Sequence, residues 1–172
     1  YPGLFSIADT PVNYFDIVHS SHVIEHVDDP KQFSAKSFNI LKSGGLYLTE
    51  TPNIDCIDAK FFRKKYWGGY HFPRHWNLYS PETVRKSLED IGFEILEIRF
   101  FPNPVFWVWT FHHYLKDKGF PEFMVNLFPA VSIFNNSFGN VLRLGFFTIV
   151  DKLLSFLIGG RMGTMQIIAR KP

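Results

Sequence analysis

Cysteine is nearly absent from the sequence, and so are long runs of one charge. Cys56 is the single cysteine among 172 residues, so no disulfide forms within the chain. No secretory leader, with a charged start followed by an apolar stretch, opens the sequence. Eighteen Lys and Arg residues against sixteen Asp and Glu give a formal net charge of +2, without a dense basic run. We therefore expect a reducing, cytoplasmic setting and no nucleic-acid partner.

Uncharged stretches suited to crossing a membrane are also lacking. Residues 100–115 carry no charged side chain, but this run is short and begins with prolines. The uncharged stretch 123–142 contains a proline and several asparagines, which hydrocarbon disfavours. Aromatic residues are abundant at 18%, twenty of them Phe. We interpret both stretches as buried or interfacial rather than transmembrane.

Short apolar runs alternate with helical patterns in the first part of the chain. Residues 15–20 predict a buried strand, and an Asp-Pro pair predicts the start of a helix over residues 30–42. After a Gly-Gly turn, residues 46–51 predict a second strand. This strand–helix–strand unit is typical of an open α/β sheet, in which ligands bind at the carboxyl ends of the strands.

The second half of the chain departs from this alternation. Residues 54–79 show no clean period and predict a long loop with a short helix at 57–65. The pattern then predicts a helix from Ser80-Pro81 to Gly92, followed by a strand to residue 101. An aromatic-rich insert over 102–162 comes next, and it contains a predicted helix at 140–159. A closing strand is predicted over 163–171.

Three segments carry a family resemblance: "FDIVHSSHVIEHVDDPKQF", "NILKSGGLYLTETPN" and "HWNLYSPETVRKSLEDIGFEI". In this order they resemble the middle and later motifs of class I S-adenosylmethionine-dependent methyltransferases, in the small-molecule group that includes ubiquinone-type O-methyltransferases. The resemblance implies a partial Rossmann-like α/β sheet whose strands are the family's fourth to seventh, in the order 4-5-7-6. Residues 1–101 and 163–172 would form the C-terminal part of the methyltransferase domain, with 102–162 as a helical insert.

The family's Gly-rich cofactor loop and its ribose-binding acidic residue have no counterpart here. No G-x-G-x-G occurs in the sequence, and the chain begins with Tyr1. We expect the sequence to be the C-terminal part of a longer enzyme that uses S-adenosyl-L-methionine. By itself the chain should then bind this cofactor poorly or not at all.

The resemblance also assigns site residues. Ser20, Ser21 and His22, at the tip of the first strand, would lie against the methionine part of the cofactor. An equal alternative for the two serines is that their hydroxyls only complete the hydrogen bonds at the end of the strand. A near-neutral imidazole suits the general base of hydroxyl methylation, and the two candidates are His75 and His71. The candidates for the substrate wall are Trp67, Tyr70, Phe72, Arg74, Trp76 and Tyr79.

Each of these assignments has a structural alternative. His75 matches the family's H-x-x-x-[FY]-S pattern, which Tyr79 and Ser80 complete, but it would also serve to tie the loop to the following helix cap. A solvated loop arginine is the common alternative for Arg74. Burial of the aromatic side chains would pin the loop to the domain, and this is compatible with a substrate pocket.

A cluster of His22, Glu25 and His26 raises the question of a metal. The spacing i, i+3, i+4 would put the three on one helical face, and His with carboxylate ligates Zn or Mn. In some family members an acidic residue at the position of His22, with this Glu and His, holds a divalent metal. Many members keep the pair without metal, and we predict a pocket edge and no metal.

The sequence as a whole predicts methyl transfer from S-adenosyl-L-methionine to a small hydrophobic acceptor, with oxygen favoured over nitrogen or carbon. For the insert, a substrate lid, a homodimer interface and a peripheral membrane contact remain open, in that order. Two alternatives come from other classes. One is a non-catalytic interaction module that docks a partner or membrane through the insert, and the other is a metal-dependent hydrolase using His22, Glu25, His26 and His75.

Overall fold

A computed structural model of the chain describes residues 5, 9–71, 73–130 and 137–172. The chain divides into two compact units. The first unit contains residues up to Pro52, residues 72–99 and residues 165–172, and the second contains residues 53–71 and 100–164. Phe72, one of the aromatic residues predicted to line a pocket, lies outside the described residues.

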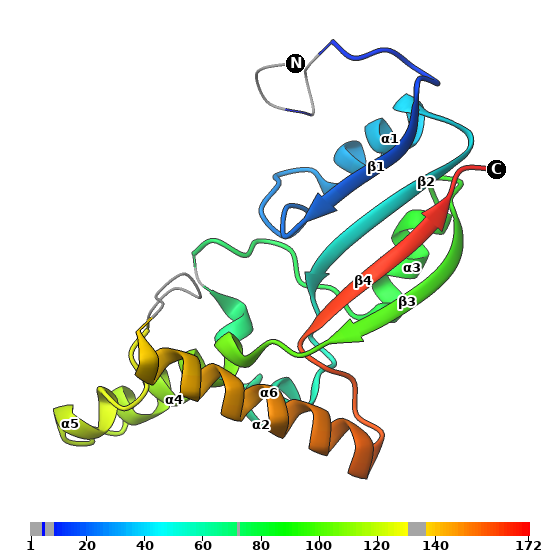
Figure 1. The fold of residues 1–172 in the computed structure, drawn as a ribbon. Coiled ribbons are helices and arrows are strands. Elements are labelled where there is room, and N and C mark those ends of the chain that lie inside the picture. The colour runs from blue at the N-terminus through cyan, green and yellow to red at the C-terminus, as the bar shows by residue number, and fades with distance from the viewer. Residues whose placement is uncertain (1–4, 6–8, 72, 131–136) are drawn as a thin grey trace. The chain divides into compact units, whose positions relative to one another are not determined.

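A mixed four-stranded sheet forms the centre of the first unit (Figure 1). Its strands are β1 (Phe15–Ser21), β2 (Leu41–Pro52), β3 (Glu94–Phe101) and β4 (Thr164–Arg170), in the order β1-β2-β4-β3. β1 and β2 pair in parallel, β3 runs in the same direction, and β4 runs opposite to them. The order predicted from the family resemblance is therefore confirmed.

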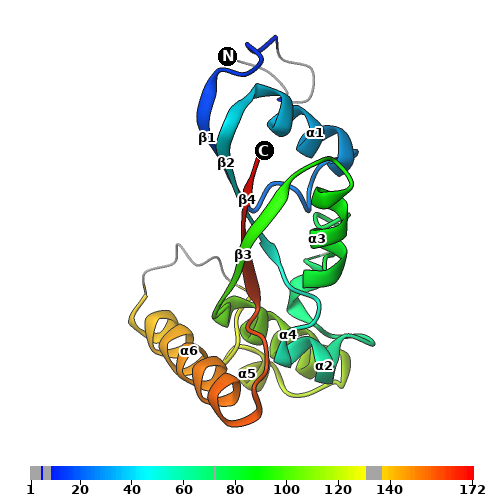
Figure 2. The same cartoon turned by 90° about the vertical axis from the view of Figure 1, so that its right-hand side faces the viewer.

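Two helices cover one face of this sheet, as Figure 2 shows: α1 (Pro30–Ile40) and α3 (Pro81–Glu89). Both begin at capping side chains that the sequence predicted. The Asp29 carboxylate accepts a hydrogen bond from the backbone N–H of Gln32, and Ser80 and Thr83 form a reciprocal capping box. α3 ends at Glu89, three residues before Gly92. The core between helices and sheet includes Phe33, Tyr47, Val84, Leu88 and Phe93.

Neither α1 nor α3 covers the other face of the sheet (Figure 1). Successive residues of a strand point to opposite faces, and Tyr47 and Thr49 on the helix side are fully buried. On the opposite side Ile17 of β1 is 59% exposed, and its neighbour on β2, Leu46, is half-buried. One face of the sheet is thus packed and the other is open to solvent in the described part of the chain.

The predicted Gly-Gly turn is wrong, because both glycines lie inside β2. The preceding helix ends two residues earlier than expected, and β2 begins at Leu41. The backbone N–H of Gly44, at φ +80°, donates to the carbonyl of Lys171 at 2.8 Å. A Cβ at Gly45 would come within 2.9 Å of the Lys42 carbonyl oxygen. The glycines therefore permit a bulge within a strand rather than ending one.

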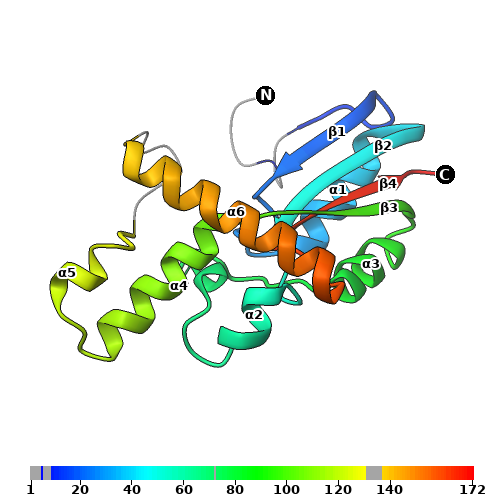
Figure 3. The same cartoon turned by 60° about the horizontal axis from the view of Figure 1, so that its bottom comes forward.

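Helices make up the second unit (Figure 3). They are α2 (Ile57–Phe62), the 3-10 turn η1 (Gly68–Tyr70), α4 (Pro104–Asp117), α5 (Glu122–Val125) and α6 (Phe138–Ile158). The predicted short helix at 57–65 therefore ends three residues early, while the helix predicted at 140–159 is confirmed within two residues. The sequence patterns did not single out α4.

The packing of α4 against α6 holds this unit together. The rings of Trp107 and Phe147 stack with centroids 5.8 Å apart. The Trp107 indole N–H donates to the buried Asp151 carboxylate at 2.6 Å, and the Asn103 backbone N–H donates to the same group at 3.0 Å. Burial raises the pKa of Asp151, and these two bonds oppose that rise. Among the described residues, no helix has the length and apolar character needed to cross a bilayer.

Candidate active site

The chain leaves β1 through a sharp turn at His22, whose φ is +52°. The His22 backbone N–H donates to the Glu50 carbonyl at the end of β2, at 3.0 Å. Its Nδ1 lies 2.9 Å from Oε1 of Glu25. This bond to Glu25 raises the pKa of His22 above its ordinary value, burial opposes the rise, and the charges of Glu25 and Glu50 add to it.

Glu25 ties the ends of the two parallel strands together. Its side chain is fully buried, and its Oε2 accepts a hydrogen bond from the Thr51 hydroxyl at 3.1 Å while Oε1 faces His22. Residues 22–28 form turns rather than a helix, so the predicted helical face is wrong. The carboxylate is instead held at the carboxyl edge of the sheet, where α/β folds bind ligands.

Ser20 and Ser21 differ in their surroundings. Ser20 is buried, donates to the Thr49 hydroxyl at 3.0 Å and lies 3.3 Å from the Tyr47 hydroxyl, as in a satisfied strand end. Ser21 is exposed and donates to Oε2 of Glu50 at 2.6 Å. That bond lowers the pKa of Glu50, burial opposes the effect, and a bond from Gln166 supports it. Ser21 and the half-exposed His22 are thus the accessible groups at the strand tip.

Residues 76–77 are pinned to the turn that follows β1. The backbone N–H groups of Trp76 and Asn77 both donate to the Glu25 carbonyl, at 2.8 and 3.1 Å. The Asn77 side-chain amide donates to the Val27 carbonyl at 2.8 Å. Segments about fifty residues apart in the sequence therefore form one wall of the site.

This wall brings His75, one of the two predicted bases, to the strand tip. The His75 and His26 rings meet edge to face with centroids 4.9 Å apart. The Nδ1 of His26 lies 2.8 Å from the carbonyl oxygen of Arg74, which directs the other ring nitrogen away from that bond. Glu25, His26 and His75 each present one ligand atom, all within 4.8 Å of one another.

The same three side chains form a candidate metal centre. The cluster considered from the sequence was His22, Glu25 and His26, and in the structure His75 takes the place of His22. Nitrogen and oxygen ligands lie about 2.1 Å from a bound Zn²⁺, so tetrahedral ligand atoms are roughly 3.4 Å apart. A spacing of up to 4.8 Å means that the side chains would have to move closer together to bind an ion. The donor set fits a divalent metal in type and only loosely in distance.

The predicted substrate residues of this wall divide by exposure. Trp76 is 74% exposed and Arg74 is exposed, so both present their side chains to solvent and to any bound molecule. Tyr79 is 8% exposed, and burial, reinforced by the nearby Tyr47 and Glu25, raises its pKa to about 12. Its hydroxyl therefore stays protonated and is able to donate a hydrogen bond at neutral pH.

Three predicted site residues belong to the second unit. Trp67 is 1% exposed, its indole N–H donates to the Asp58 carboxylate at 2.9 Å, and its ring meets Tyr70 edge to face. His71 lies edge to face with Trp109, with centroids 4.8 Å apart. These contacts agree with the alternative stated for the aromatic side chains, in which their burial pins the loop to the rest of the fold. The roles of Trp67, Tyr70 and His71 toward a substrate stay predictions.

Two residues of the site escaped the sequence analysis. The Glu50 carboxylate accepts one hydrogen bond from the Ser21 hydroxyl and another from the side-chain amide of the half-buried Gln166, the latter at 2.7 Å. Its place at the end of the second predicted strand was the available signal, because parallel neighbours end at the same edge. Asn77 has no comparable signal, since its role depends on carbonyls that only the tertiary fold brings near.

Comparisons with known proteins agree with this architecture. A family model described as a methyltransferase domain matches residues 5–98. The ubiquinone biosynthesis O-methyltransferase of a Ruegeria species is 29% identical over 105 residues, which cover 56% of this chain and 41% of that protein. A SAM-dependent methyltransferase structure from Archaeoglobus fulgidus aligns with a TM-score of 0.51 at 20% identity, over 94% of this chain and 62% of the other. Phosphoethanolamine N-methyltransferase 2 of Haemonchus contortus, in complex with S-adenosyl-L-methionine, aligns with a TM-score of 0.53 at 18% identity, over 98% and 36%.

The chain belongs to the methyltransferase domain family, because the family model covers more than half of it. The similar structures show a shared Rossmann-like α/β fold of the class I methyltransferases. S-adenosyl-L-methionine is the methyl donor in this family. The chain spans about two fifths of the length of the curated relative.

Proposed function

We propose that the protein containing this chain transfers a methyl group from S-adenosyl-L-methionine to an oxygen of a small hydrophobic acceptor. The observation that carries the proposal is the wall made by residues 74–77. It holds His75 beside Glu25 and His26 at the carboxyl edge of a methyltransferase sheet. Family membership supports the reaction class, and the exposed Trp76 supports an apolar acceptor.

The residues of the strand tip fit one part of the cofactor. Ser21 and His22 offer accessible polar groups for its methionine end, whereas the buried Ser20 shapes the strand end from within. When bound, the cofactor supplies an electrophilic methyl carbon on a sulfonium. The open face of the sheet supports a further covering segment, since α/β sheets are packed on both faces.

His75 is the proposed general base. As the acceptor oxygen forms its bond to the methyl carbon, the sulfur–carbon bond breaks and the hydroxyl proton passes to the imidazole. The ring of His26, itself held by the Arg74 carbonyl, fixes one side of His75. Arg74 and Trp76 are the proposed acceptor contacts, with Tyr79 as a buried hydrogen-bond donor and His71 as the second candidate base.

A second candidate use of the same site is metal-assisted methyl transfer, favoured by the grouping of Glu25, His26 and His75. In that case the metal would be held by these three side chains and would polarise the acceptor oxygen. Titration of Mn²⁺ or Zn²⁺ into the parent and a His75→Ala variant distinguishes the two. Saturable binding that His75→Ala abolishes supports the metal, and its absence supports the base.

The proposed function is tested by calorimetric titration of S-adenosylhomocysteine into two proteins. One is this 172-residue chain, and the other extends it upstream by about a hundred residues, roughly the missing part of a domain. We expect binding only by the longer protein, and loss of affinity on Ser21→Ala with His22→Ala. Binding by neither protein would favour the alternative of a non-catalytic interaction module. The predicted cytoplasmic location stays a prediction, which fractionation of cells tests.

A further inference from the structure

An exposed apolar face runs along the whole of α6, in the second unit. The helix has 21 residues, and on it nine apolar side chains are more than half exposed. A helix of this length extends about 30 Å. Soluble proteins rarely expose contiguous apolar patches larger than a few hundred Å², and larger patches mark contact surfaces. The nine are Phe138, Val141, Leu142, Phe146, Ile149, Leu153, Phe156, Leu157 and Ile158.

The opposite side of α6 is already occupied. Phe147 is buried against Trp107 of α4, with Leu144, Val150 and Leu154 packed around them. Asn140 and Asp151 are also buried on this side. Packing within the unit therefore explains the inner face of the helix, and it leaves the outer apolar face without a partner among the described residues.

Charges on this helix have one sign where they reach solvent. Asp151 is the single acidic residue of α6, and it is 2% exposed and bonded to Trp107 and Asn103. The two basic residues are Lys152, which is exposed, and Arg143, which is partly exposed. The second unit as a whole has nine Lys and Arg against five Asp and Glu, a formal net charge of +4.

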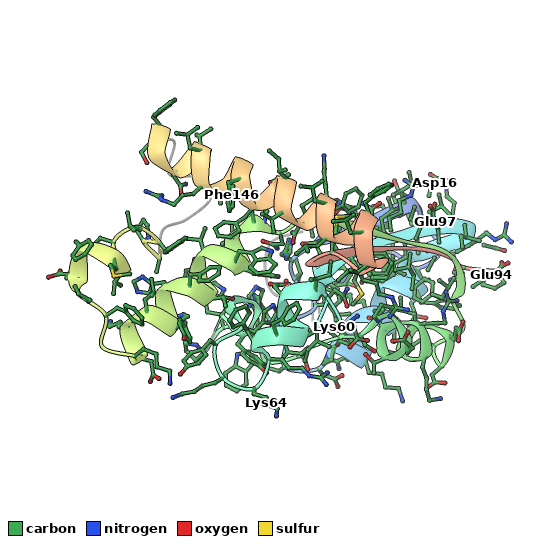
Figure 4. The ribbon with its side chains drawn as sticks, turned by 90° about the horizontal axis from the view of Figure 1, so that it is seen from below. Asp16, Lys60, Lys64, Glu94, Glu97 and Phe146 are labelled. Atoms are coloured by element: carbon green, nitrogen blue, oxygen red, sulfur yellow. The ribbon has the colours of Figure 1, made fainter. Side chains whose placement is uncertain are left out.

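Two further basic residues of this unit lie apart from α6. Figure 4 shows Lys60 and Lys64 projecting from the segment at α2, away from the helix that carries Phe146. On α6 itself, the cations beside the apolar face are Arg143 and Lys152. An exposed apolar helical face whose solvent-facing charges are all positive is suited to lie in the plane of an anionic membrane surface.

We propose that the outer face of α6 rests on an anionic lipid bilayer, with the helix axis parallel to the membrane and the Phe, Leu and Ile side chains in the headgroup–acyl boundary. Anionic headgroups complement Arg143 and Lys152. In a two-fold contact between copies of this chain, by contrast, the same helix would present only cations at its rim, with no exposed acid on α6 to pair with them. The charge pattern thus favours lipid over a second copy.

Vesicle flotation tests the proposal with the 172-residue chain. The vesicles are phosphatidylcholine alone, and phosphatidylcholine with about a third phosphatidylglycerol. We expect binding that is stronger on the anionic vesicles. The double substitution Ile149→Gln with Phe156→Gln should weaken it about a hundredfold, because these exposed side chains lose their apolar burial. Lys152→Gln should weaken binding to the anionic vesicles about fivefold.

Matched controls come from the first unit. Leu96→Gln removes an exposed apolar side chain of β3, and Lys86→Gln removes an exposed charge of α3, and neither should change flotation. Circular dichroism melts check that every variant is folded. No flotation on either vesicle would overturn the proposal, and so would binding that the α6 double variant retains. Sedimentation showing a dimer that this variant dissociates, without vesicle binding, would assign the face to a second copy instead.

Discussion

The carboxylate of Glu25 faces Nδ1 of His22 at 2.9 Å with one oxygen and accepts from the Thr51 hydroxyl with the other. The bond from Thr51 is buried and shielded from water, whereas the contact with the half-exposed His22 is only partly buried. The pair joins the turn after β1 to the end of β2 at the edge where the proposed site lies. Glu25 is therefore as important for the shape of this edge as for any chemistry there.

Glu25→Gln should lower the free energy of unfolding by about 2–3 kcal/mol, because a buried charge-assisted network loses its charge and one acceptor. Urea denaturation followed by circular dichroism measures this. Glu97→Gln is the matched control, since Glu97 pairs with Arg99 on the exposed surface, where an ion pair adds little stability. Equal midpoints for the two variants would show that the Glu25 network does not stabilise the fold.

His75→Ala in the full-length enzyme should lower kcat about 10²- to 10⁴-fold, the range expected for loss of a general base. The KM for the methyl acceptor should change little, because the imidazole is proposed to act on a proton rather than to bind the acceptor. Added imidazole should restore part of the activity. A variant with kcat within a factor of two of the parent would exclude His75 as the base and move attention to His71.

Ser80→Ala should destabilise the protein by about 1 kcal/mol, because the Ser80 hydroxyl accepts from the Thr83 backbone N–H at the start of α3. Ser80→Gly should cost only a few tenths of that. Thermal melts of both variants are compared with Ser43→Ala, at an exposed position of β2. If Ser80→Ala melted at the same temperature as Ser43→Ala, the capping box would contribute nothing measurable.

Local chemistry explains which parts of the fold could be predicted from sequence. The Ser80 and Asp29 caps depend on residues three positions apart, so the starts of both helices were predicted correctly. The Gly44-Gly45 pair was misread because its role is set by Lys171, at the far end of the chain. A local turn and a bulge in a strand need the same residue type, and only the tertiary pairing distinguishes them.

The site shows the same limit. The predicted cluster of His22, Glu25 and His26 assumed a helix, whereas His22 has a positive φ and the residues after it form turns. His75 joins Glu25 and His26 across about fifty residues of sequence, through backbone bonds from Trp76 and Asn77 to Glu25. No periodicity encodes such a contact, so the residue types were predictable and their grouping was not.

A buried carboxylate in the second unit makes the stability of the protein depend on pH. Asp58 is 2% exposed, and burial raises its pKa from 3.8 to about 6, although hydrogen bonds from Cys56 and Trp67 oppose the rise. The protonated native form therefore contributes stability that is fully present below the unfolded pKa of 3.8. That stability is lost as the pH rises through about 6.

Asp58→Asn removes this titration while an amide oxygen still accepts the Trp67 N–H. The variant should therefore gain stability relative to the parent between pH 4 and pH 8, by about 3 kcal/mol for a pKa difference near two units. Urea denaturation at both pH values measures the change. Asp16→Asn, at an exposed carboxylate paired with Lys42, should follow the parent at both. If the stability of Asp58→Asn changed with pH as that of the parent does, Asp58 would not titrate in this range. The hydrogen bonds from Trp67 and Cys56 would then compensate the burial of an ionised carboxylate in the core.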